Sequence, residues 1–278
     1  MKAIYTSLIA LAFVACGAPE AKEETVEEIL VEEVQVTLEA KIVDYATDEA
    51  NMTGYMVNDT QFEGKKPGVL VVHEWWGHND YARERADKLA ELGYVAFAVD
   101  MYGNGKKASH PKDAMKFAGE VFGNIDEAKL RFDKALDILK QDPNVDTTRI
   151  AAIGYCFGGS VVLSMANAGK DLDVVAAFHA GLQLPIQPSD DSLLTKIAVY
   201  QGADDPFVSE EDVAKYKESL DKVGATYEYK AYADAVHAFT SKGADSLGVA
   251  FELPLAYNAK ADSASWADMQ LFFEKYLK

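Results

Sequence analysis

One hexapeptide limits the folds open to this chain more than any other segment: Gly154-Tyr155-Cys156-Phe157-Gly158-Gly159. An apolar, strand-like run at residues 149–153 precedes it, and a small and apolar helical pattern at residues 160–165 follows it. Glycines on both sides of Cys156 permit a turn that is too tight for side chains at the flanking positions. The segment therefore predicts a sharp strand-to-helix turn that projects Cys156 outward.

A strand, a Gly-x-nucleophile-x-Gly turn and a helix make up the nucleophile elbow of α/β-hydrolases, which this segment resembles. Most members of that fold carry a serine at the central position, where this chain has Cys156. A free cysteine is more often a small buried hydrophobe, but packing alone does not explain three glycines around it. Because a thiol attacks only once it is deprotonated, the protonation state of Cys156 has to be controlled.

The rest of the chain alternates between predicted strands and predicted helices. After an outer hairpin at 36–43 and 53–57, buried strands are predicted at 68–72, 94–99, 150–153, 174–178, 197–200 and 226–232. Helical patterns lie between and after them, at 81–92, 112–120, 126–140, 160–168, 209–223 and 263–277, with Ser209 as a helix cap. Such alternation is typical of a mostly parallel sheet covered by helices on both faces. We expect one domain with the α/β-hydrolase fold over residues 36–278.

The N-terminal residues carry targeting signals. Lys2 and a short apolar run at residues 4–14 resemble a signal peptide over residues 1–15, and the run is too short for a transmembrane helix. The tetrapeptide that ends it, Phe13-Val14-Ala15-Cys16, resembles the lipobox of bacterial lipoproteins, in which the cysteine is lipidated. We expect an exported, membrane-anchored bacterial lipoprotein that faces the periplasm or the cell exterior. Ordinary signal-peptide cleavage is the alternative.

The chain is acidic, with a net charge of -18 over 278 residues. Eight glutamates and one lysine lie within residues 20–39, so residues 16–35 are predicted to be a solvated tether, with an acidic docking segment as the alternative. No basic stripe is present to neutralise phosphates, which argues against nucleic-acid binding. The two cysteines are Cys16 and Cys156. If Cys16 carries lipid, Cys156 has no intramolecular partner, and a disulfide framework is excluded.

Two segments after Cys156 supply the remaining parts of a catalytic triad. Each follows a predicted strand, where catalytic groups of open α/β sheets gather. The first contains Asp204 and Asp205, and the second contains His237. The order nucleophile, acid, base matches that of α/β-hydrolases. Asp205 fits the pattern Gly-x-x-Asp-x-x-Val, whereas Asp204 is one residue off and should point elsewhere.

Residues 73–78 also stand out, because they place two histidines and a glutamate directly after a predicted strand. A zincin motif needs His-Glu-x-x-His on a helix, whereas His73 and His78 are five residues apart, so we expect no metal site. In α/β-hydrolases the loop after this strand supplies one oxyanion-hole N–H, and the residue after the nucleophile supplies the other. Trp75 and Phe157 are the matching residues here.

Together these segments resemble the dienelactone hydrolases, also called carboxymethylenebutenolidases. The resemblance covers nearly all of residues 40–278 and rests on five segments: 73–77, 100–103, 154–159, Asp205 and 237–239. In that family the glutamate matching Glu74 contacts the nucleophilic thiol, keeps it protonated at rest and accepts its proton when substrate binds. The resemblance therefore implies that Glu74 controls Cys156.

The resemblance does not extend to the family's substrate-binding arginines. One of them lies where this chain has Gly103 and Asn104, and the other lies within Thr240-Ser241-Lys242. Lys242 lacks the bidentate geometry of arginine, which argues against dienelactone itself. Nearby aromatic residues, with Trp76 and Tyr102 as candidate substrate-binding residues, favour a neutral or apolar acyl group.

The leading hypothesis is an ester or lactone hydrolase that forms an acyl-thioenzyme through Cys156, His237 and Asp205. An acyltransferase with the same triad is one alternative, and a non-catalytic surface-binding lipoprotein is the other. We expect a small-molecule ester or lactone as the substrate, no cofactor, contact with a membrane only through the lipid on Cys16, and a monomer.

Overall fold

The computed structural model of the protein describes residues 36–189 and 193–277. Its strands are β1 (Leu38–Ala46), β2 (Asn51–Asp59), β3 (Lys66–Val72), β4 (Val95–Val99), β5 (Val145–Tyr155), β6 (Val174–Phe178), β7 (Lys196–Gly202) and β8 (Tyr227–Tyr232). Its helices are α1 (Asp80–Glu91), α2 (Pro111–Gly123), α3 (Ile125–Gln141), α4 (Phe157–Asn167), α5 (Glu210–Lys222), α6 (Ala244–Phe251) and α7 (Ala259–Tyr276).

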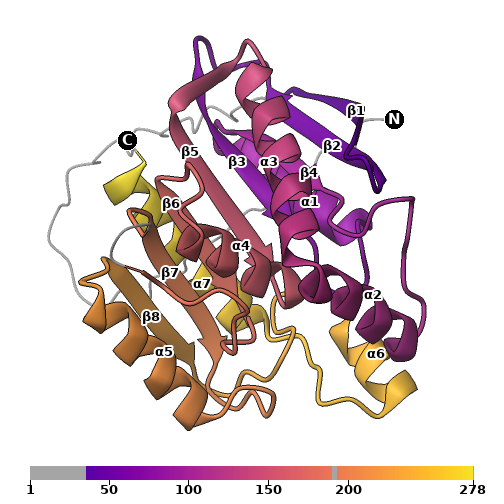
Figure 1. The fold of residues 1–278 in the computed structure, drawn as a ribbon, viewed down its shortest axis with the longest axis vertical. Coiled ribbons are helices and arrows are strands. Elements are labelled where there is room, and N and C mark those ends of the chain that lie inside the picture. Colours follow the sequence, from indigo (N-terminus) through magenta and orange to yellow (C-terminus); the bar gives the residue numbers. More distant parts are fainter. Residues whose placement is uncertain (1–35, 190–192, 278) are drawn as a thin grey trace, which may run out of the picture. The chain divides into compact units, whose positions relative to one another are not determined.

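The strands form one sheet in the order β1-β2-β4-β3-β5-β6-β7-β8 (Figure 1). The pairs β1–β2 and β2–β4 are antiparallel, and every pair from β4 to β8 is parallel. The register aligns the carboxyl ends of the central strands: Val72 pairs with Gly154, and Tyr155 pairs with Phe178. The loops that follow β3, β5 and β6 therefore leave the sheet at one common edge.

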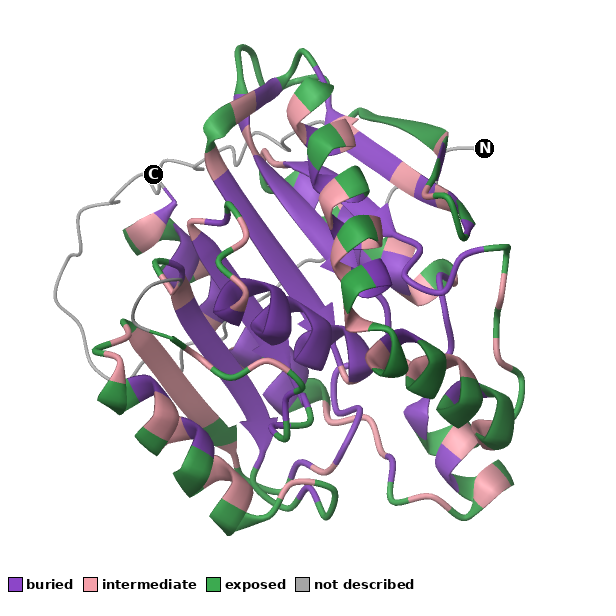
Figure 2. Cartoon of the chain, in the orientation of Figure 1, coloured by how far each residue is buried: buried purple, intermediate pink, exposed green. Residues whose placement is uncertain are grey.

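Each face of the sheet packs against its own set of helices. On β3, Leu70 and Val72 contact the core shared with α2, α3, α4 and α5, whereas Val69 and Val71 contact the core shared with α1 and α7. Figure 2 shows that the central strands and α4 are almost entirely buried, while the outer face of α5 is exposed. Alternating side chains on a strand point to opposite faces, so a strand covered on both sides is a continuous apolar run. The predicted α/β-hydrolase fold is confirmed.

Capping residues in the sequence mark the ends of several helices. Ser209 caps α5 and forms a capping box with Asp212, and Gly93 follows α1 with φ of 88°. Two elements differ from the prediction: β5 begins five residues earlier than expected, at Val145, and α6 was not predicted. α6 has only 8 residues with Gly248 in its interior. Because glycine weakens a helix and a short helix is marginal by itself, its local signal is weak.

The expected signal peptide (1–15), the lipidation site at Cys16 and the acidic tether (16–35) lie outside the described residues. Within the part that is described, no helix is both long and apolar enough to span a membrane.

Candidate active site

Cys156 occupies the tight turn between β5 and α4 that the hexapeptide predicts. Its backbone is left-handed, with φ of 53°, and its N–H donates to the carbonyl oxygen of Phe178 at 2.9 Å. The flanking glycines are required by close backbone contacts. A Cβ on Gly154 would lie 2.1 Å from the carbonyl oxygen of Gly158, and a Cβ on Gly158 would lie 2.3 Å from that of Val72. The elbow is therefore built from backbone packed on backbone, which excludes larger residues.

His237 joins the two other predicted members of the triad. Its Nε2 lies 3.1 Å from Sγ of Cys156, and its Nδ1 lies 2.8 Å from Oδ2 of Asp205. The three side chains come from the loops after β5, β7 and β8. The structure thus brings the predicted nucleophile, base and acid into one hydrogen-bonded chain.

Asp205, and not Asp204, faces the imidazole. The Asp205 carboxylate also accepts hydrogen bonds from the Phe207 N–H at 2.9 Å and from Nε2 of Gln201 at 3.2 Å. Asp204 is exposed, and its N–H donates to the carbonyl oxygen of Ala235. The alternation argument for Asp205 is correct, because consecutive residues point in different directions.

The site favours the protonated form of His237. Burial by itself lowers the pKa of His237, but the charge and hydrogen bond of Cys156, together with those of Asp205, outweigh burial and raise it to about 10. Cys156 is also the N-cap of α4, where the positive end of the helix dipole stabilises an anion. The geometry therefore favours a protonated His237 within hydrogen-bond distance of the Cys156 sulfur.

A profile of the dienelactone hydrolase family matches residues 52–277. The chain belongs to that family. It is a dienelactone hydrolase-family hydrolase of the α/β-hydrolase superfamily, and the arrangement of its Cys156, His237 and Asp205 matches a Cys-His-Asp triad. The resemblance inferred from the sequence is confirmed.

Similar proteins support this membership over nearly the whole described part of the chain. The protein named usf from Aquifex pyrophilus is 29% identical over 243 residues, which cover 85% of this chain and 99% of that protein. The crystal structure of a dienelactone hydrolase-like promiscuous phosphotriesterase from metagenomic libraries is 32% identical, with a TM-score of 0.80, and covers 87% of this chain and 99% of that one. A structure named m3DLH has the same identity and coverage, with a TM-score of 0.81.

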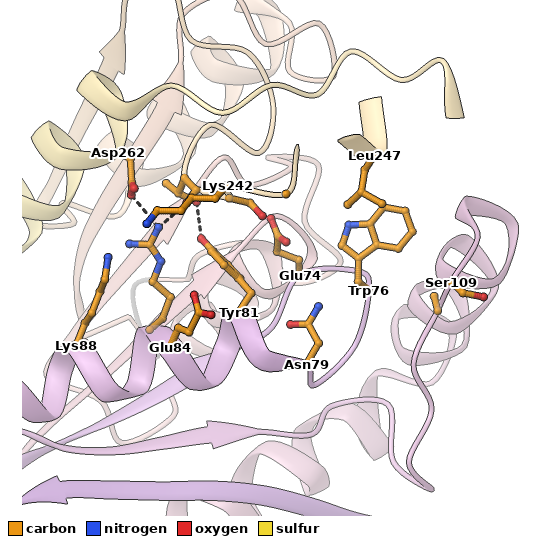
Figure 3. A pocket seen from close by; sticks show the side chains of 15 residues that line it. Glu74, Trp76, Asn79, Tyr81, Glu84, Lys88, Ser109, Lys242, Leu247 and Asp262 are labelled. Atoms are coloured by element: carbon orange, nitrogen blue, oxygen red, sulfur yellow. Dashed lines mark hydrogen bonds and ion pairs between the residues drawn. The ribbon is translucent and has the colours of Figure 1, made fainter. Parts of the chain in front are cut away.

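Glu74, which was expected to control the thiol, lines a cavity of about 460 Å³ whose lining does not include the triad residues. Figure 3 shows it between Tyr81 and Trp76, with Lys242 reaching across the same space. Burial raises the pKa of Glu74 to about 7, against the charges of His237 and Arg85, which lower it. No hydrogen bond joins its carboxylate to Cys156 among the described residues. Glu74 is thus electrostatically coupled to His237, and it ionises near neutral pH.

The loop that carries Trp75, the predicted oxyanion residue, is held by two buried side chains. Nδ1 of His73 donates to the carbonyl oxygen of Glu74 at 2.5 Å, and its Nε2 accepts from the Met101 N–H at 3.3 Å. The Tyr102 hydroxyl donates to the carbonyl oxygen of Trp75 at 2.9 Å. Tyr102 is therefore a buried support for the loop, and its expected contact with substrate stays a prediction.

The second oxyanion residue, Phe157, is the first residue of α4. Its N–H is one of the first four in the helix, which have no hydrogen-bond acceptor within the helix itself. Its ring stacks on His73, with centroids 5.6 Å apart, and contacts Tyr102. The two predicted oxyanion residues are thus linked through one aromatic cluster.

The cavity beside Glu74 contains charged residues that sequence analysis missed. Arg85 of α1 is buried, and its Nη2 donates to Asp262 at 2.7 Å and to the carbonyl oxygen of Thr240 at 2.5 Å. Trp76 and Lys242 line the cavity as well. In sequence, Arg85 looks like one more polar residue of an amphipathic helix, so only its burial distinguishes it.

Within residues 36–189 and 193–277, no group of three or more His, Cys, Asp or Glu side chains is arranged to hold a metal ion. His73 uses both ring nitrogens for backbone hydrogen bonds, so it has no free electron pair for a metal. The structure gives His73 a supporting role in the loop.

Proposed function

We propose that this protein hydrolyses a carboxylic ester or lactone through an acyl-thioenzyme intermediate on Cys156. The single observation that carries the proposal is the hydrogen-bonded chain from Asp205 through His237 to Cys156. In the first half-reaction, Sγ forms a bond to the carbonyl carbon. The bond from that carbon to the alcohol oxygen breaks, and Nε2 of His237 gives its proton to the leaving oxygen.

Water completes the cycle in the second half-reaction. His237 takes a proton from water as the water oxygen attacks the thioester carbon, and the carbon–sulfur bond breaks to release the acid and the thiolate. Asp205 holds the imidazole in the tautomer with a proton on Nδ1 and stabilises its charged form. The N–H groups of Trp75 and Phe157 bind the oxyanion in both steps.

Glu74 governs the resting state of the thiol in this proposal. At rest the thiol of Cys156 keeps its proton, and when substrate binds the carboxylate of Glu74, whose pKa is about 7, accepts that proton. Cys156 is then protected from oxidation until it is needed.

The decisive test compares the wild type with Cys156→Ala on p-nitrophenyl acetate. The proposal expects hydrolysis to fall to the uncatalysed rate in the variant while its melting temperature stays unchanged. An acetylated Cys156 should be trapped by acid quenching of the wild type and identified by peptide mass spectrometry. Undiminished hydrolysis in Cys156→Ala would rule the mechanism out.

A second candidate activity is phosphotriester hydrolysis. It is favoured by the 32% identity to a dienelactone hydrolase-like structure that is named a promiscuous phosphotriesterase. Assaying paraoxon beside p-nitrophenyl acetate tests it, because both reactions release p-nitrophenol. If both use the triad, Cys156→Ala loses both; if the phosphotriester rate survives, it comes from another site or from a contaminant.

Two other candidates predicted from the sequence remain open to experiment. Acyl transfer is separated from hydrolysis by product analysis in the presence of added alcohols or amines. A non-catalytic binding role predicts no turnover of any ester and no acylated Cys156. The acyl group of the natural substrate is proposed to be neutral or apolar, because Gly103, Asn104 and Lys242 stand near the family's arginine positions.

We also propose that the protein is an exported lipoprotein anchored through Cys16, by the lipobox resemblance. Metabolic labelling with a fatty acid and cell fractionation test this. The wild type should be labelled and should sediment with membranes. Cys16→Ala should not be labelled and should remain in the soluble fraction. Unlabelled wild type would favour ordinary signal-peptide cleavage.

A further inference from the structure

A second histidine, His179, lies directly behind the catalytic imidazole. It follows β6 at the sheet edge that carries the elbow, and its side chain has no exposed surface. Its ring lies edge-to-face against that of His237, with centroids 5.3 Å apart, and against Phe239 at the same distance. His179 is therefore part of the wall that limits the movement of the His237 ring.

His179 is held in an unfavourable backbone conformation. Its φ of 38° lies in the left-handed region, which residues other than glycine adopt rarely. The strain places its N–H on the carbonyl oxygen of Tyr200 at 2.8 Å and its ring under His237. A glycine or asparagine would adopt this backbone more readily. The strain is therefore a cost of placing an imidazole ring at this position.

A hydrogen-bonded chain fixes the orientation of the His179 ring. Nε2 of His179 lies 2.8 Å from Oγ1 of Thr240, which in turn lies 2.6 Å from the Tyr81 hydroxyl. Thr240 belongs to the loop of His237, three residues further on, and Arg85 holds its carbonyl oxygen. These hydrogen bonds therefore link the end of β6 to the loop of His237 and to α1.

The surroundings of His179 keep its ring neutral. Burial, followed by the positive charges of His237 and Arg85, holds the pKa of His179 well below its usual value. The other groups packed against it are the rings of Tyr155 and Phe239. A neutral ring can lie beside the imidazolium of His237 without repelling it.

Nδ1 of His179 indicates which atom donates in each hydrogen bond from His179 to Tyr81. Nδ1 of His179 is buried without a hydrogen-bond partner among the described residues, and leaving a donor unpaired there costs more than leaving an electron pair. Nε2 therefore carries the hydrogen and donates to Thr240, whose hydroxyl donates to Tyr81. Tyr81, which then accepts this bond, lines the same cavity as Glu74.

We propose that His179 is a positioning residue for His237, and that Thr240 and Tyr81 act through it by fixing its ring. The proposal rests on the catalytic role of His237 in the proposed function. His179 touches no reacting atom, and its effect is to hold the imidazole at the distance and angle that proton transfer to and from Cys156 requires. Misplacement by about 1 Å can cost a hundredfold in rate.

The first test removes the middle hydroxyl without changing the shape of the side chain. Thr240→Val should lower kcat by about tenfold or more and leave KM within about twofold. Thr240→Ser restores the hydroxyl and should recover most of the rate. Tyr216→Phe is the matched control, because the Tyr216 hydroxyl is buried without a hydrogen-bond partner in the described part of the chain. Its removal should leave kcat and KM unchanged. Equal losses in Thr240→Val and Thr240→Ser would overturn the proposal.

A second test needs no substrate, so it stands even if ester hydrolysis is not the reaction. The rate at which iodoacetamide alkylates Cys156 is measured against pH. Since a well-placed His237 stabilises the thiolate, the midpoint of the curve should move to higher pH in Thr240→Val and Tyr81→Phe, but not in Thr240→Ser. If Thr240→Val fails to fold, Tyr81→Phe decides alone. Curves that coincide with the wild type would overturn the proposal.

Discussion

Nδ1 of His237 lies 2.8 Å from Oδ2 of Asp205, across 32 residues of sequence, and both side chains are buried. The same carboxylate accepts hydrogen bonds from Gln201 and from the backbone of Phe207. Three donors on one carboxylate fix its orientation. The imidazole therefore has one tautomer and one direction, with Nε2 facing the thiol.

Asp205→Asn tests this relationship. An amide in place of the carboxylate can donate to Nδ1 and so favour the wrong imidazole tautomer. We expect kcat to fall on the order of a thousandfold or more with KM little changed, as measured on p-nitrophenyl acetate. Asp204→Asn is the control, because Asp204 is exposed and does not face His237; a comparable loss in that variant would reassign the acid.

Glu74→Gln should make the protein more stable at alkaline pH. The folded pKa of Glu74, about 7, lies above its ordinary value of 4.5. Above pH 7 the buried carboxyl group must carry a charge in the folded protein. That buried charge lowers the free energy of unfolding by about 3 kcal/mol. The penalty is absent below pH 4.5 and develops between pH 4.5 and 7.

The measurement is urea unfolding of wild type and Glu74→Gln at pH 4.5 and pH 8. The two curves should nearly coincide at pH 4.5, and the variant should be more stable at pH 8. Glu84→Gln is the control, since Glu84 lines the same cavity but is exposed. A variant that is no more stable at pH 8 would contradict a buried, charged Glu74.

Gly158→Ala should prevent formation of the elbow. Its Cβ would lie 2.3 Å from the carbonyl oxygen of Val72, which is backbone and cannot move aside cheaply. We expect a loss of more than about 3 kcal/mol or failure to fold. Gly119→Ala is the matched control in α2, where nothing lies within 4 Å, and thermal unfolding should show a gain of about 0.5–1 kcal/mol. Similar melting temperatures for the two variants would contradict the close contact.

Tyr102→Phe should weaken transition-state binding more than substrate binding. It removes the donor to the carbonyl oxygen of Trp75, so the loop that presents the Trp75 amide is less well fixed, at a cost of about 1–2 kcal/mol. We expect kcat on p-nitrophenyl acetate to fall about tenfold. Tyr227→Phe, whose hydroxyl bonds Asp221 at the surface, should match the wild type. An unchanged kcat in Tyr102→Phe would show that the loop does not need this bond.

Sequence patterns predicted the main strands and helices because each carries a local signal. The central strands are continuous apolar runs, and α1 and α5 begin or end at residues with specific capping roles. α6 escaped prediction because an interior Gly248 weakens its pattern and its stability comes from tertiary packing. Cys156, Asp205 and His237 were predictable because each follows a strand, and parallel strands end at one edge.

His179, Thr240, Tyr81 and Arg85 were not predictable in the same way. A histidine after a buried strand was a visible signal, but nothing in the sequence shows that its backbone is left-handed or that its ring lies against His237. Thr240 and Tyr81 are 159 residues apart, and their contact depends on how α1 packs against the catalytic loop. Such contacts arise from packing across the sheet, which local patterns do not encode.

The sequence by itself determined the fold class, the family and the nucleophile, because turn chemistry and hydrophobic period are local properties of the chain. The tertiary structure decided which aspartate faces His237, placed Glu74 in a buried cavity where it ionises near pH 7, and set a neutral His179 behind the catalytic ring. These features depend on burial and on the distances between charges. Both quantities exist only when segments far apart in the chain are packed together.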